Sequence, residues 1–155
     1  YVRFVKQGSV EGLSVSLPDE GDVYRWECAM RPPADTPLAR ELSAFAEKHK
    51  RPETVQMEIH FTDSFPNEPP FIRIVSPRFA FHSGHITMGG SICTELLTTS
   101  GWSPAYTLES VLVDIRATIV QGDGRLDPSQ AHVPYALQEA REAFDRVARH
   151  HRWIK

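Results

Sequence analysis

The sequence predicts an α+β domain, in which strands come first along the chain and most of the helical sequence follows. Three stretches before residue 62 alternate apolar and polar side chains, and two stretches after residue 106 repeat apolar side chains every three to four positions. Alternation is typical of strands with one buried face, and the longer period is typical of amphipathic helices. Strands that precede helices, instead of alternating with them, favour the α+β class.

The predicted strands are short and follow one another along the chain. A fourth strand, FIRIVSP, ends at Pro77, because proline lacks the N–H group that a strand ladder needs. We expect these strands to form an antiparallel meander with one buried face. The alternating apolar positions of the first three are Leu13, Val15 and Leu17; Tyr24, Trp26, Cys28 and Met30; and Val55, Met57, Ile59 and Phe61.

Three helices are predicted. Thr36 and Pro37 begin one that lies between the second and third strands, because threonine is a good N-cap and proline suits the first helical position. We interpret this helix as a packed insertion, and the alternative is a contact surface for a partner. Thr107 caps the second helix, and Pro134 precedes the third. The expected apolar faces are Leu38, Leu42, Phe45, Ala46 and His49; Leu108, Val111, Leu112, Ile115 and Ile119; and Leu137, Ala140, Phe144, Val147 and Ala148.

Length and composition restrict the class of protein. A chain of 155 residues, 41% of them hydrophobic, suggests one domain with one core. It begins with Tyr1 instead of Met, so we expect residues 1–155 to be a single domain excised from a longer chain. The net charge of −3 argues against a nucleic-acid partner, and no apolar run approaches the ~20 residues of a membrane span.

Two cysteines favour free thiols in a reducing compartment, and they differ in context. Cys28 is in step with Trp26 and Met30, so we expect a buried, unreactive thiol. Cys93 lies in the long region 78–106, which lacks a clear period, and we expect Gly89 and Gly90 to keep the approach to its thiol uncrowded. Cys93 is therefore a candidate nucleophile, and the alternative is an incidental loop cysteine.

A nucleophilic thiol needs a base, a metal or a helix end to activate it. His82 and His85 are near Cys93 in sequence, and the three together would supply metal ligands, although no CxxC or HExxH pattern supports such a site. A Cys-His-Asp hydrolase is a further alternative, since chain order does not show which side chains meet.

Three motifs follow one another along the chain: Phe65-Pro66-Asn67-Glu68-Pro69-Pro70, Gly90-Ser91-Ile92-Cys93 and Trp102-Ser103-Pro104. Taken in this order, they resemble the ubiquitin-conjugating enzymes, and most of all their Q-type subfamily. The resemblance covers about residues 11–150 and implies the fold of that family, a four-stranded antiparallel sheet with C-terminal helices, here with an extra helix between strands 2 and 3. It further implies one ubiquitin-conjugating domain over residues 1–155.

The resemblance also implies a chemistry. Cys93 would accept ubiquitin, or a ubiquitin-like modifier, as a thioester from an activating enzyme and pass it to a lysine of a substrate or ligase. No cofactor or metal is implied, because the activating enzyme uses the ATP. The implied location is the cytoplasm or nucleus, and the implied state is a monomer.

The family's histidine-proline-asparagine motif is missing. Counting back from Cys93 without gaps places His85 where the asparagine is expected, and an imidazole N–H group could serve as the donor to the acyl oxygen. Glu95 stands near the position of a family aspartate and would orient the incoming lysine, and the alternative is a solvated loop carboxylate. Asp127 is the candidate for the family's gate beside the cysteine, where a carboxylate would take a proton from that lysine or help to desolvate it. Without the motif, an inactive variant that binds ubiquitin or acts as a scaffold is the alternative.

The family's ligases hold two loops. In this chain the expected contacts are Phe65, Pro66 and Asn67 in the first loop and Ser103, Pro104 and Ala105 in the second. Asn67 replaces the usual bulky apolar residue, so we expect weak binding to RING-type ligases. The family's first helix, which docks the activating enzyme, would have only the residues YVRFVKQGSVEG, which is short for a stable helix. We therefore expect either that this helix is truncated here or that loading of the modifier onto Cys93 is inefficient.

Overall fold

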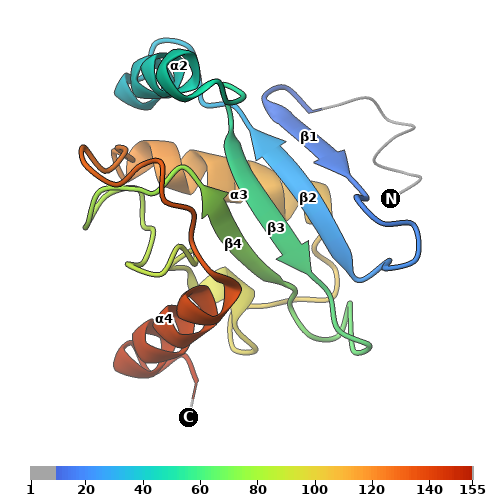
Figure 1. Cartoon of the computed structure of the whole chain (residues 1–155). Helices are drawn as coiled ribbons and strands as arrows, with labels where there is room; N and C mark the ends of the chain where they lie inside the picture. The colour runs from blue at the N-terminus through green and yellow to red at the C-terminus, as the bar shows by residue number, and fades with distance from the viewer. Residues whose placement is uncertain (1–9, 155) are drawn as a thin grey trace.

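Four strands form one antiparallel sheet in the order β1-β2-β3-β4 in the computed structural model, which describes residues 10–154 (Figure 1). Each strand pairs with its neighbour in sequence, so the predicted meander is confirmed. The expected docking helix falls mostly on residues 1–9, outside the described residues. The strands are β1 (Leu13–Ser16), β2 (Arg25–Met30), β3 (Val55–His60) and β4 (Phe71–Ser76).

Three of the strands are shorter than predicted, since Leu17, Tyr24 and Phe61 lie outside them. The prediction was wrong at Tyr24 because Asp22 makes a turn there, accepting a hydrogen bond from the Tyr24 N–H at 3.1 Å. Aspartate side chains that bond the backbone two residues on favour turns over strands. Tyr24 is consequently 48% exposed instead of facing the core.

All three predicted helices are present, and the two predicted threonine caps are confirmed. Thr36 and Thr107 each accept a hydrogen bond from the backbone N–H three residues on, at 3.2 and 3.1 Å. Among residues 10–154, no helix is long and apolar enough to cross a membrane. The helices are α2 (Pro37–His49), α3 (Leu108–Gln121) and α4 (Leu137–His150).

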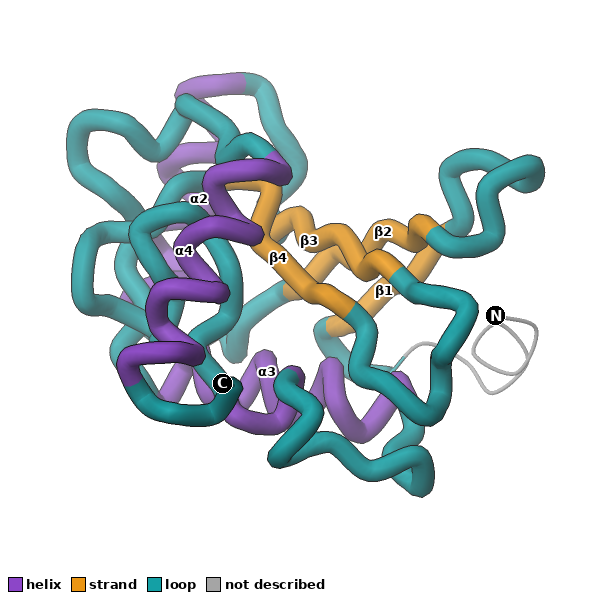
Figure 2. The backbone as a smooth tube through the Cα atoms, turned by 90° about the horizontal axis from the view of Figure 1, so that it is seen from below, coloured by secondary structure: helices purple, strands orange, loops and turns teal. Residues whose placement is uncertain are grey.

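The core lies between the sheet and α3, which crosses one face of the sheet (Figure 2). α2 packs into the same core, and its Glu41 carboxylate accepts hydrogen bonds from the Arg125 guanidinium at 2.8 Å and the Leu126 N–H at 2.9 Å. These contacts support the interpretation of α2 as a packed insertion. Fully buried core residues include Met57, Ile59, Ile72, Ile74, Leu112, Ile115 and Ile119.

Candidate active site

Cys93 lies at the end of a small hairpin in the long loop. Ile86 and Ile92 form an antiparallel bridge, and the Cys93 N–H donates to the His85 carbonyl at 2.8 Å. Ile86 and Ile92 are buried, so the two-residue period of the hairpin turns His85 and Cys93 the other way. Cys93 is half-buried and His85 is exposed.

The Cys93 side chain opens on a groove of about 480 Å³ between this loop and α4. The loop supplies one wall and the last two turns of α4 supply the other, so an incoming chain can reach the thiol from solvent. The lining residues are Phe81, His82, His85, Ile86, Thr87, Met88, Cys93, Gly122, Ala143, Arg146, Val147 and His151.

The two thiols differ as predicted in burial. Cys28 on β2 has no exposed surface, and burial raises its pKa to about 12. Partial burial also raises the pKa of the Cys93 thiol. Within residues 10–154 no side chain hydrogen-bonds to the Cys93 sulfur, so the protein does not hold it as a thiolate.

His85 adopts a left-handed backbone conformation, with φ of 56°. A Cβ atom added at Gly122 would lie 2.6 Å from the His85 ring, so the ring rests on that glycine. His82 packs against Phe81, with ring centroids 3.6 Å apart and ring planes tilted by 45°. Both histidines line the groove with Cys93, but in the described part of the chain no three His, Cys, Asp or Glu side chains lie close enough to hold a metal ion.

Glu95 and Asp127 do not line the groove. Glu95 begins the short 3-10 helix η1 (Glu95–Leu97), and its carboxylate accepts from the Ser100 hydroxyl at 3.2 Å. The Asp127 carboxylate accepts from the N–H groups of Ser129 and Gln130, both at 2.8 Å. These hydrogen bonds, the one from Ser129 first, hold the pKa of Asp127 below its ordinary value.

Gly89 and Gly90 have a different role from the one expected. A Cβ at Gly89 would lie 2.2 Å from the Glu139 carbonyl, and one at Gly90 would lie 2.5 Å from the Tyr135 ring. The two glycines therefore let the hairpin pack tightly against Tyr135 and the start of α4. Their physical contribution is close packing behind the hairpin, and the expectation that they clear the approach to the thiol was wrong.

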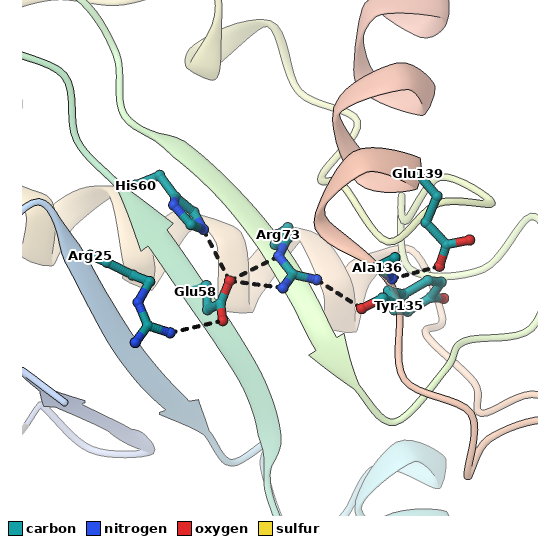
Figure 3. Close-up of polar contacts among 7 residues, drawn as sticks. All are labelled: Arg25, Glu58, His60, Arg73, Tyr135, Ala136 and Glu139. Carbon is teal, nitrogen blue, oxygen red and sulfur yellow. Dashed lines mark hydrogen bonds and ion pairs between the residues drawn. The ribbon is translucent and has the colours of Figure 1, made fainter. Parts of the chain in front are cut away.

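Figure 3 shows what holds Tyr135 in place. The Arg73 guanidinium on β4 donates to the Tyr135 carbonyl at 2.9 Å and pairs with Glu58 at 2.8 Å. Glu58 also pairs with Arg25 at 3.5 Å and lies 3.0 Å from His60. The outer face of the sheet is thereby tied to the segment that supports the Cys93 hairpin.

The two expected ligase loops lie side by side. The Trp102 indole donates to the Pro66 carbonyl at 2.8 Å, and the Phe65 and Trp102 rings are 6.2 Å apart. Asn67, Pro66, Pro104 and Ala105 are exposed, and Ser103 accepts from the Ala105 N–H at 3.3 Å. The contacts of Trp102 with Pro66 and Phe65 thus hold the two loops next to each other.

Sequence reasoning missed the α4 wall of the groove. Arg146 and His151 were not singled out, and Val147 was assigned to a buried face although it is half-buried and lines the groove. Phe81 and Met88 were also missed. They carried a signal, because large apolar residues in a loop without a period need not be buried.

A model of the family described as ubiquitin-conjugating enzyme matches residues 3–152. The chain belongs to the ubiquitin-conjugating enzyme family. A human relative named as a Q-like ubiquitin-conjugating enzyme is 33% identical over 90% of this chain and 83% of its own length. Human "Ubiquitin-conjugating enzyme E2 Q1" is 35% identical over 83% of this chain, and the match spans only 30% of that protein's length.

Solved structures of ubiquitin-conjugating enzymes share the fold. UbcA1 from Agrocybe aegerita superposes with a TM-score of 0.59 at 16% identity, covering 84% of each chain. Human E2 G1 superposes with a TM-score of 0.58 at 21% identity, covering 76% of this chain and 87% of its own. The expected family, its Q-type character and its fold are therefore confirmed.

Proposed function

We propose that Cys93 carries ubiquitin, or a ubiquitin-like modifier, as a thioester. The observation that carries the proposal is one thiol open to a groove while the other is fully buried. The Cys93 sulfur attacks the thioester carbonyl on the activating enzyme. A new carbon–sulfur bond forms, the old one breaks, and the proton of Cys93 passes to the departing thiolate through solvent.

In the second step a lysine amine of a substrate or ligase attacks the same carbonyl carbon. A carbon–nitrogen bond forms, the bond to the Cys93 sulfur breaks, and the amine loses a proton to solvent or to a base. The Cys93 sulfur is the attacking atom in the first step and the departing atom in the second. A groove open to the sulfur is therefore required in both steps. The roles expected for Glu95 and Asp127 stay predictions, since neither carboxylate lines the groove.

A non-reducing gel tests the proposal after the chain is mixed with activating enzyme, ATP and ubiquitin. We expect a thiol-sensitive adduct that Cys93→Ala abolishes and Cys28→Ala retains, because only Cys93 reaches solvent. An adduct that survives Cys93→Ala contradicts the proposal. Absence of an adduct, together with measurable ubiquitin binding, supports the scaffold alternative, which is favoured by the missing histidine-proline-asparagine motif and a Cys93 thiol without a side-chain partner.

His85 is our proposed donor to the acyl oxygen. It lies opposite Cys93 across the hairpin, and its ring makes no hydrogen bond within residues 10–154, so an N–H group is free to donate. We expect His85→Ala to slow discharge to free lysine at least tenfold while loading persists, and His82→Ala to have a smaller effect. Equal discharge by the His85→Ala variant and the unsubstituted chain removes this role.

Ligase binding is proposed to use the paired loops at weak affinity. Asn67 is exposed where an apolar anchor would enter a ligase pocket. We expect Asn67→Phe to strengthen binding to a RING domain by about tenfold, since an interface anchor contributes more than about 1 kcal/mol. Calorimetric titration measures the affinity for the RING domain, and Glu68→Gln is the control at the neighbouring exposed position. Tight binding by the unsubstituted chain contradicts the expectation.

We also propose a monomer in the cytoplasm or nucleus, where a reducing environment keeps both thiols free.

A further inference from the structure

Among the described residues, the only permanently charged side chain that lines the groove beside Cys93 is a cation, Arg146. Apart from the thiol, its ionisable lining residues are His82, His85, Arg146 and His151, and neither aspartate nor glutamate is among them. The chain as a whole has a net charge of −3, so this local excess runs against its composition.

Arg146, at the α4 wall of the groove, has no acidic partner among the residues that the structure describes. The three acidic residues on α4 have other partners: Glu139 pairs with Arg78 and Asp145 with Arg149, both at 2.9 Å, and Glu142 accepts from the Gln138 side-chain amide at 2.9 Å. No hydrogen bond or ion pair involves the Arg146 guanidinium anywhere in residues 10–154, and the residue is exposed. Its charge is therefore available to a bound molecule.

Apolar surface lies beside this charge. Phe81 is 63% exposed and Met88 is 68% exposed, the highest values for large apolar residues in the described part of the chain. Both line the groove. Exposed apolar residues next to a nucleophile mark a binding surface, and methionine adapts its shape to varied partners.

We infer that the groove selects acceptor peptides in which the lysine is flanked by carboxylates and a bulky apolar residue. The inference rests on the proposed function of Cys93. An ammonium group alone is repelled by Arg146, whereas flanking carboxylates offset that repulsion. The charge of Arg146 also lowers the pKa of the amine once it is bound, which favours the neutral form that attacks the thioester.

Single-turnover discharge tests the inference. The chain is first loaded with ubiquitin, the activating enzyme is then stopped, and two peptides are compared: one with glutamate and leucine beside the lysine, the other with glutamine in place of glutamate. We expect discharge to the acidic peptide to be about fivefold faster, and the ratio to shrink at high salt. Equal rates for the two peptides overturn the inference.

Arg146→Glu is the decisive variant. Because each variant is scored by its own ratio of acidic to neutral peptide, a general loss of activity cancels. We expect the ratio to fall to about one or to invert. Arg40→Glu on the exposed side of α2 makes the same change in net charge and should keep the fivefold ratio.

The other outcomes are separable. An unchanged ratio in Arg146→Glu overturns the inference, as does an equal fall in Arg40→Glu, which would indicate a general charge effect. If Arg146→Glu alters loading and leaves the peptide ratio intact, the groove binds the modifier's tail and the inference fails. Failure of the unsubstituted chain to load at all contradicts the proposed function instead.

Discussion

At the scale of single residues, Cys28 and Cys93 show how position sets thiol chemistry. Cys28 is in register with Met57 of β3 on the buried face of the sheet, and burial raises its pKa to about 12. Cys93 ends a hairpin at an open groove, with its pKa raised by partial burial. The reactive species is the thiolate, so Cys93 is accessible but not activated in advance.

We therefore predict selective and pH-dependent alkylation. In the native protein iodoacetamide should modify Cys93 and spare Cys28, and the Cys93 rate should rise about tenfold per pH unit while pH stays below its pKa. Mass spectrometry of peptides after timed quenching measures both. Denaturant should expose Cys28 and serves as the control. A Cys93 rate that is flat between pH 6 and 8 would show a thiolate already formed and contradict the assigned pKa direction.

At the scale of elements, the hairpin of residues 85–93 is fixed from two sides. The Gly90 carbonyl accepts from the Ile74 N–H at 2.7 Å, which joins the hairpin to β4. Tyr135 covers Gly90, and the Tyr135 hydroxyl accepts from the Phe79 N–H at 2.8 Å. The position of Cys93 thus depends on β4 and on the segment before α4.

Gly90→Ala should destabilise the protein by more than about 2 kcal/mol. The backbone there has φ of +91°, which costs about 1–2 kcal/mol for a residue with a Cβ, and the added atom would lie 2.5 Å from the Tyr135 ring. Urea unfolding measures the change. Gly21→Ala is the matched control, since its nearest neighbour is the Asp19 carboxylate at 3.2 Å in an exposed turn. Equal stability of the two variants contradicts the proposed packing.

At the scale of the whole molecule, one half-buried carboxylate connects three strands and the segment before α4. Glu58 on β3 reaches Arg25 on β2 and Arg73 on β4, and Arg73 continues to Tyr135 (Figure 3). A hydrogen bond from His60, followed by the charge of Arg73, lowers the pKa of Glu58 to about 2 against the opposing effect of burial.

This pKa predicts acid sensitivity. Because the folded-state pKa lies below the ordinary 4.5, the stabilisation is complete above pH 4.5 and is lost as pH falls toward about 2. We expect a loss on the order of 2 kcal/mol, measured by urea unfolding across that range. Glu58→Gln should reduce the pH dependence, and Glu27→Gln on the adjacent strand should retain it. The same acid loss in Glu58→Gln would show that other groups are responsible.

Much of the fold followed from local patterns. Alternation at Val55, Met57 and Ile59 predicted β3, and Thr36 with Pro37 predicted the start of α2. The error at Tyr24 arose because an aspartate turn competes with strand periodicity over the same residues. The motifs around Cys93 led to the family, and alternation with Met30 placed Cys28 in the core.

The sequence by itself determined the order of elements, the family and which cysteine is buried, since each depends on residues a few positions apart. Only the tertiary structure decided that Arg146 lines the same groove as Cys93, that the Tyr135 ring packs against Gly90 and that Asp127 is held by its own turn. The first two join residues more than forty positions apart. Such contacts are selected by packing of the whole chain, and no local period records them.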